Sequence, residues 1–100
     1  MSTQWRCSIC LKQILYSELF TFYSKGAVHY TCFREYAKKS SIKSVDIMLE
    51  MLEKELKMIV DYKRYINEVS EDIKQLLSDN EKDAEKHAAL LTKMIDNMIK

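Results

Sequence analysis

The sequence has no proline and a single glycine among its 100 residues, against background frequencies of roughly 5% and 7%. Sheets with many tight turns depend on these two residues, so a large all-β fold is excluded. No apolar run approaches the ~18 residues that a membrane-spanning helix requires. Trp5, Arg6 and Cys7 interrupt the start of the chain, where a signal peptide would have its apolar segment. We therefore expect a soluble, cytoplasmic protein.

The composition divides the chain near Ser40 into two parts. Residues 1–40, here called the head, contain all three cysteines, the only glycine and eight of the ten aromatic residues. Residues 41–100, here called the tail, contain no glycine and no cysteine. With 47% apolar and 31% charged residues, the chain is too apolar to be disordered. We predict a small, mostly α-helical α+β fold with two domains, 1–40 and 41–100.

The head contains two closely spaced pairs of metal-ligand residues in the pattern C-x2-C-x18-H-x2-C. Zinc prefers four tetrahedral ligands drawn from thiolate and imidazole, and in structural sites all four come from protein. The pattern uses every cysteine of the chain and one of its two histidines. It therefore predicts a structural Zn²⁺ site whose ligands are Cys7, Cys10, His29 and Cys32.

Two other readings of these cysteines are open. A redox-active Cys7–Cys10 disulfide would leave Cys32 and His29 without a role, and the βαβ pattern expected for it is missing. An iron or iron–sulfur centre usually takes four thiolates, so the histidine counts against it. Zinc is the reading that uses all four residues.

The segment between the two pairs predicts a β-hairpin followed by a short helix. Residues 18–23 are rich in strand formers, 24–26 supply a turn, and 27–30 return the chain to the metal. Residues 33–39 read as a helix, whose N-terminal dipole would favour the Cys32 thiolate. This order of knuckle, hairpin and helix is that of a treble clef. We expect five aromatic side chains to pack around the metal, namely Trp5, Phe20, Phe22, Tyr30 and Phe33.

On these residues the head resembles two known groups of proteins. The second ligand pair, within residues 28–33, resembles the first zinc-binding half of a LIM domain, but the second LIM zinc site is absent. Over residues 5–36 the chain is similar to a family of small archaeal zinc-finger proteins of uncharacterised function. This resemblance implies a metal and a small treble-clef-like fold, and it implies no activity.

Enzymatic activity is not expected. Four protein ligands leave zinc no open position for water or substrate. The sequence has no H-E-x-x-H motif, and a phosphate-binding loop of the G-x-x-x-x-G-K type needs more than one glycine. His87 is the only histidine outside the metal pattern, and it lies on a helical pattern. We therefore expect no small-molecule substrate.

The tail predicts two helices, over residues 42–77 and 81–99. Ser78 and Glu81 fit a capping box, which places a turn at 78–81; a single unbroken helix is the alternative. A second apolar stripe runs from Ala84 to Met98 on the shorter helix. The first stripe, on the longer helix, comprises Ile42, Val45, Leu49, Leu52, Leu56 and Ile59. The tail is thus expected to form a long helical hairpin or coiled coil. Because the shorter helix would cover only half of the longer one, this stripe predicts a helical-bundle or coiled-coil homodimer, or a partner helix.

The head and the tail differ in charge as well as in composition. The head has six bases and two acids, whereas the tail has ten bases and thirteen acids. The predicted function is a non-enzymatic zinc-binding adaptor, whose head docks an unidentified protein and whose tail mediates oligomerisation. The alternative is a protein that binds nucleic acid or the ribosome. Its phosphate contacts would come from Arg6, Lys12, Lys25, Arg34, Lys38 and Lys39.

Overall fold

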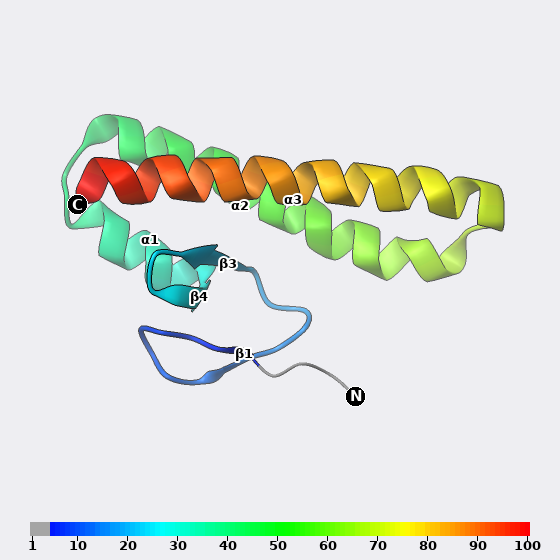
Figure 1. Ribbon diagram of the computed structural model, residues 1–100, viewed down its shortest axis with the longest axis horizontal. Helices are drawn as coiled ribbons and strands as arrows, with labels where there is room; N and C mark the ends of the chain where they lie inside the picture. Colours follow the sequence, from blue (N-terminus) through cyan, green and yellow to red (C-terminus); the bar gives the residue numbers. More distant parts are fainter. Residues whose placement is uncertain (1–4) are drawn as a thin grey trace.

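The computed structural model describes residues 5–100, so the first four residues of the predicted head lie outside the described part. Two long antiparallel helices lie side by side, and the strands and a short helix cover one side of them (Figure 1). Within residues 5–100, no helix is long and apolar enough to cross a membrane. The elements in chain order are β1 (Trp5–Arg6), β2 (Gln13–Ile14), β3 (Phe20–Tyr23), β4 (Gly26–His29), α1 (Tyr30–Lys38), α2 (Lys43–Tyr65), the 3-10 turn η1 (Ile66–Glu68) and α3 (Glu71–Ile99).

The predicted hairpin of the head is confirmed. Strands β3 and β4 pair antiparallel, with Phe20 opposite His29 and Tyr23 opposite Gly26. Gly26 has a φ of 112°, a conformation that costs a side-chain-bearing residue energy and glycine almost nothing. The one glycine of the chain therefore stands where the hairpin turns. A smaller pair, β1 with β2, closes the loop that carries the first two cysteines.

Helix α1 begins three residues earlier than the sequence indicates. Strand β4 runs directly into it, and His29 is its N-cap residue, with a ψ of 141°. The predicted start at Phe33 missed one turn, because the aromatic and β-branched residues before it resemble a strand. The earlier start places Cys32 in the first helical turn.

The turn predicted at residues 78–81 is wrong, and so is the alternative of one unbroken helix. The chain turns at η1 and the residues up to Ser70, and 78–81 lie inside α3. The Ser70 hydroxyl donates to Asp72 at 2.6 Å, and the Asp72 carboxylate accepts the N–H of Ile73 at 3.1 Å. Glu71 and Asp72 also place negative charge at the helix N-terminus, which favours a start there.

This displacement of the turn changes how the helices cover each other. Helix α2 has 23 residues and α3 has 29, so α3 extends along the whole of α2. Five members of the first stripe, Val45 to Ile59, are buried within the chain, and Ile42 is half-buried. On α3, Ala84, Ala88 and Ile95 are buried as well. The stripe therefore needs no second copy to cover it, contrary to the prediction, although oligomerisation itself stays a prediction.

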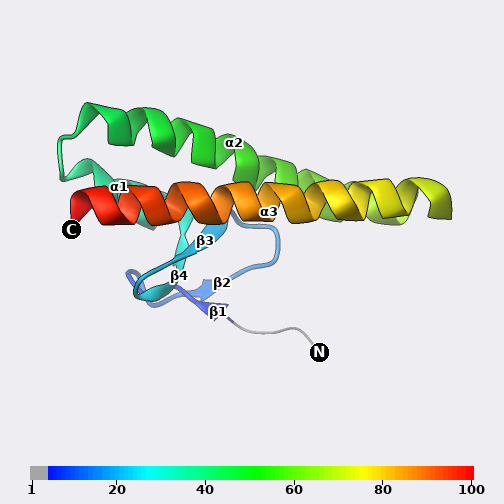
Figure 2. The same cartoon turned by 45° about the horizontal axis from the view of Figure 1, so that its top comes forward.

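The head and the helices share one hydrophobic core, as the approach of β3 to α3 in Figure 2 shows. The hydroxyls of Thr21 and Thr92 lie 2.7 Å apart and are buried. The Tyr30 hydroxyl donates to the carbonyl of Leu49 at 2.8 Å. These contacts fix the head against both helices.

The expected aromatic packing in the head is only partly correct. Tyr30 and Phe33 are buried, whereas Trp5 and Phe22 are 44% and 50% exposed. Trp5 and Phe22 lie edge to face, with ring centroids 5.1 Å apart. Phe22 points outward because side chains alternate along β3, and its neighbour Thr21 faces α3.

Candidate metal centre

The four residues of the cysteine and histidine pattern meet at one point of the head. One potential ligand atom from each of Cys7, Cys10, His29 and Cys32 lies within 4.8 Å of all the others. Ligands around tetrahedral zinc are about 3.3–3.8 Å apart, given Zn–S and Zn–N bonds of about 2.3 and 2.0 Å. The four residues are therefore close enough to bind a metal ion. All three cysteines are free of disulfides.

The first ligand pair lies in the tight loop between β1 and β2. The Cys7 N–H donates to the carbonyl of Lys12, and the Leu11 N–H donates to the carbonyl of Cys7, both at 2.9 Å. Leu11 has a φ of 67°, so the residue after the second cysteine takes a left-handed conformation. This turn brings both sulfurs to the same side of the loop.

The second ligand pair is positioned by the hairpin and by α1. His29 is the last residue of β4, and Cys32 lies in the first turn of α1. The Ser8 N–H donates to the carbonyl of Ala27 at 2.9 Å, which ties the cysteine loop to β4. Two separate hairpins and one helix therefore hold the four ligands.

The sulfur of Cys7 accepts hydrogen bonds from two backbone groups. The N–H groups of Cys10 and His29 donate to it at 3.5 and 3.4 Å. Burial alone would raise the pKa of Cys7, but these hydrogen bonds outweigh it and lower the pKa to about 6. The backbone thus stabilises a thiolate, which is the form that binds metal.

The thiol of Cys32 is shifted in the opposite direction. Burial, together with hydrogen bonds and repulsion from Cys7 and Cys10, raises the pKa of Cys32 to about 12. Three neighbouring thiols cannot all ionise while no cation balances their charge. A bound divalent cation supplies that balance, so this donor set fits a metal ion.

The carboxylate of Glu18 contacts the ring nitrogen of His29 that faces away from the cysteines. The Nδ1 atom of His29 lies 3.3 Å from the sulfur of Cys10, and its Nε2 atom lies 3.1 Å from Glu18. The Leu15 N–H donates to the same Glu18 oxygen at 2.7 Å. That hydrogen bond, and after it the contact with His29, lowers the pKa of Glu18. Burial opposes protonation of His29, but hydrogen bonds to Cys7 and Glu18 raise its pKa.

This pairing leaves Nδ1 of His29 facing the sulfurs and Nε2 facing a carboxylate, which is a common arrangement behind metal-ligating histidines. No sequence motif pointed to Glu18. The signal was the pairing of the hairpin: Phe20 pairs with His29, so Glu18, two residues before Phe20, lies beside the end of the hairpin that carries His29.

The comparisons with known proteins identify the family. The model of a family described as "Uncharacterized protein conserved in archaea (DUF2175)" matches residues 3–97. The chain belongs to the DUF2175 family. The match extends through α2 and most of α3, so the helical tail is part of what defines DUF2175. The resemblance to archaeal proteins described from the sequence covered only residues 5–36. No curated protein and no solved structure matches the chain.

The six bases proposed to contact nucleic acid come from separate elements of this DUF2175 chain. Arg6 lies in β1, Lys12 in the cysteine loop and Lys25 in the turn between β3 and β4, whereas the other three lie in or directly after α1. Arg34 and Lys38 line a hollow together with three acids of α2, Asp46, Glu50 and Glu53. The bases of α1 therefore stand beside carboxylates rather than on an open basic surface.

A cavity of about 190 Å³ lies between part of the head and the two long helices. Its lining includes Tyr16, Glu18 and Phe20 from the head and Leu56 and Lys63 from α2. The ammonium of Lys63 lies 4.8 Å from the ring centre of Tyr16 and 5.9 Å from that of Phe20. No sequence pattern points to Tyr16 or Lys63, because their contact depends on how the head docks on α2.

Proposed function

We propose that this DUF2175 protein is a non-enzymatic zinc-binding adaptor, in which a zinc-stabilised head docks a macromolecular partner. The observation that carries the proposal is the convergence of Cys7, Cys10, His29 and Cys32 within 4.8 Å. When bound, zinc would cross-link the two hairpins and α1. In a head of 40 residues, which cannot build a large core, this cross-link supplies folding free energy.

The ligand set supports a structural rather than a catalytic zinc. Three thiolates and a neutral imidazole complete a tetrahedral shell and leave no position for water. The order of cysteine loop, hairpin and helix with ligands in the loop and at the helix start supports a treble-clef-like zinc finger. A catalytic role would need a position that these four residues already fill.

The surface of the head supports a docking role. Six large apolar side chains of the head are more than 40% exposed: Trp5, Ile9, Leu11, Leu15, Tyr16 and Phe22. Of these, Trp5 and Phe22 lie in contact, with ring centroids 5.1 Å apart, and exposed apolar side chains in contact with one another are typical of a surface that another macromolecule covers. Zinc would hold this surface rigid, since the cysteine loop carries two of the six.

The test is elemental analysis of the purified full chain with cobalt substitution. We expect one zinc per chain and, with Co²⁺, the intense visible bands of tetrahedral thiolate coordination. Cys10→Ser should lose both, whereas Ile9→Ala, a change at an exposed neighbouring residue, should keep both. Absence of bound metal overturns the proposal, and iron in place of zinc overturns the identity of the metal.

One observation favours a second function, binding of single-stranded nucleic acid by the head. The exposed rings of Trp5, Tyr16 and Phe22 could stack on bases, and Arg6 and Lys12 could contact phosphates. Binding should weaken steeply with salt.

The charge reversals Arg6→Glu and Lys12→Glu should reduce this binding more than reversal of Lys38 and Lys39, because Lys38 stands beside acids of α2. A flat salt response excludes this function. If the chain binds another protein, and this binding is unchanged by both pairs of charge reversals, the adaptor function is favoured.

A further inference from the structure

The two long helices carry an apolar face that no part of residues 5–100 covers. Of fourteen large apolar side chains that are exposed, eight lie on α2 and α3. Six of them form what is called the outer face. They are Ile47, Met51 and Met58 on α2 and Leu76, Leu90 and Met94 on α3, each at least 45% exposed.

The outer face lies on the side away from the head. On α3, Thr92 contacts the head through Thr21, and Asp96 accepts the N–H of Ser24 at 3.1 Å. Leu90 and Met94 are each two residues from Thr92, which is about 200° around a helix. They therefore point in the opposite direction from the residues that hold the head.

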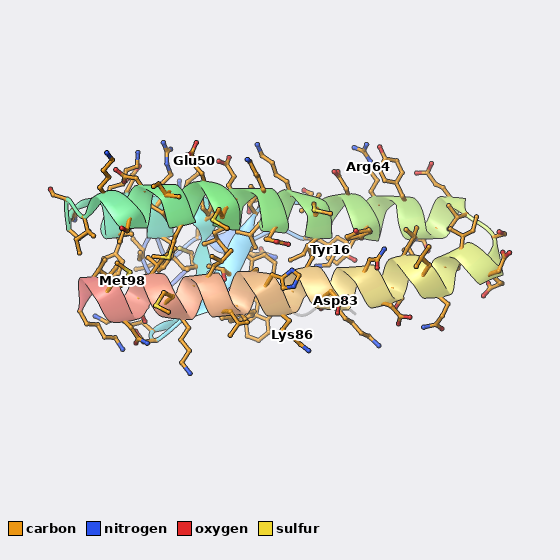
Figure 3. All side chains as sticks on the ribbon, turned by 90° about the horizontal axis from the view of Figure 1, so that it is seen from above. Tyr16, Glu50, Arg64, Asp83, Lys86 and Met98 are labelled. Carbon is orange, nitrogen blue, oxygen red and sulfur yellow. The ribbon has the colours of Figure 1, made fainter. Side chains whose placement is uncertain are left out.

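The same geometry holds on α2. The backbone carbonyl of Leu49 accepts a hydrogen bond from the Tyr30 hydroxyl, so this part of α2 faces the head. Ile47 and Met51 are each two residues from Leu49 and point about 200° away. Figure 3 looks down on this side of the two helices, with Glu50 and Arg64 at the outer edge of α2 and Lys86 at that of α3.

The outer face has the size of a stable interface. The molecule is 45 Å long, and two packed helices present a width of roughly 18–20 Å. The resulting face of about 800–900 Å² matches the ~800 Å² that each partner contributes to a standard stable complex. The six apolar side chains are part of this face and supply its apolar contacts.

We infer that a second copy of this chain covers the outer face, forming a four-helix bundle in which α2 of each copy packs on α3 of the other. This deepens the oligomerisation expected of an adaptor, and so rests on the proposed function. A two-fold axis along the helices generates the bundle from two identical faces.

Charge along the edges supports a second copy as the occupant. The Glu55 carboxylate lies 3.5 Å from His87. This contact shows which residues of α2 and α3 stand at the same height along the helix axes. A two-fold axis along the helices keeps these levels between copies. It places Arg64 level with Asp79 of the other copy, so that a base meets an acid along each outer edge.

Sedimentation equilibrium of the metal-loaded full chain tests the inference. Wild type should have the mass of a dimer. Leu90→Asp, at a position 61% exposed in the single chain, should weaken dimerisation at least about 100-fold, because the symmetric interface loses this contact twice. The matched control Leu15→Asp changes a residue of the head that is 55% exposed and should leave the dimer intact.

A charge exchange tests the orientation of the two copies. Arg64→Asp alone should weaken the dimer by roughly tenfold, and the double variant Arg64→Asp/Asp79→Arg should recover it. A wild-type monomer at the highest attainable concentration overturns the inference and leaves the face to a helix of another protein. A dimer that Leu90→Asp does not weaken overturns it as well, since the copies then meet elsewhere.

Metal content is measured on the same samples, so the two proposals fail separately. A monomer with one zinc per chain contradicts the bundle and leaves the zinc centre standing. A dimer without bound metal contradicts the zinc centre and leaves the bundle standing.

Discussion

At the scale of single residues, the metal centre depends on a carboxylate that lies behind a ligand. Glu18 faces Nε2 of His29, which directs Nδ1 to the sulfurs. Glu18→Gln should lower zinc affinity by about tenfold to 100-fold, as loss of such supporting partners typically does. Competition with a chromophoric chelator measures this, with Glu35→Gln on α1 as the control. Equal affinities of the Glu18 variant and wild type would show that Glu18 does not orient the histidine.

Leu11 is the residue-scale weak point of the cysteine loop. Its φ of 67° costs a residue with a branched side chain roughly 1 kcal/mol, a cost that asparagine largely avoids. Because Leu11 is 64% exposed, its replacement loses little packing. Leu11→Asn should therefore stabilise the metal-loaded head by up to about 1 kcal/mol, and Leu11→Val should destabilise it. Urea unfolding monitored by Trp5 emission measures both, and the opposite order would contradict the strain.

The ligand residues could be predicted from the sequence, whereas their surroundings could not. Spacing within each pair is local, so Cys7, Cys10, His29 and Cys32 were identified without a structure. Glu18 depends on the register across a hairpin. The contact of Lys63 with Tyr16 depends on the docking of the head, which no local pattern encodes.

At the scale of elements, the helix boundary shows where local signals fail. Ser78 and Glu81 have the spacing of a capping box, but inside α3 their neighbours form ordinary helical contacts, such as that of Gln75 with Asp79 at 3.0 Å. The apolar stripe of α2 ends at Ile59, and Lys63 stands where its next apolar residue would be, just before the helix ends at Tyr65. Which apolar face continues beyond a turn depends on the element that it packs against, so the local sequence did not place the turn correctly.

A glycine scan distinguishes the two positions of the turn. Asn80 lies inside α3 and Asn67 lies in η1. Asn80→Gly should lower the free energy of unfolding by about 0.5 kcal/mol, because glycine is the poorer residue within a helix, and Asn67→Gly should change it much less. Urea titration followed by circular dichroism measures both. The reverse ranking would restore the turn to residues 78–81.

At the scale of the whole molecule, one buried hydrogen bond joins residues 71 positions apart. The Thr92 hydroxyl donates to the carbonyl of Ala88 at 2.8 Å, so the Thr21 hydroxyl is the donor toward Thr92. Thr92→Val should cost about 1–3 kcal/mol, since it leaves the Thr21 donor buried without a partner. Thr21→Val should cost less, and the double variant should cost less than Thr92→Val alone. Additive costs in a double-mutant cycle would show that head and helices are not coupled here.

The shared core also decides what metal removal does beyond the head. Chelation should unfold the head with α1, which supplies nine helical residues, while α2 and α3, with 23 and 29, remain largely helical. The urea concentration at which α2 and α3 are half unfolded should nevertheless fall, because Tyr30 and Thr21 no longer cover these helices. Circular dichroism and Trp5 emission, with zinc-saturated chelator as the control, follow the two parts separately. Unchanged Trp5 emission after complete metal removal would contradict a structural role for the metal, and an unchanged midpoint would contradict the coupling of the head to the helices.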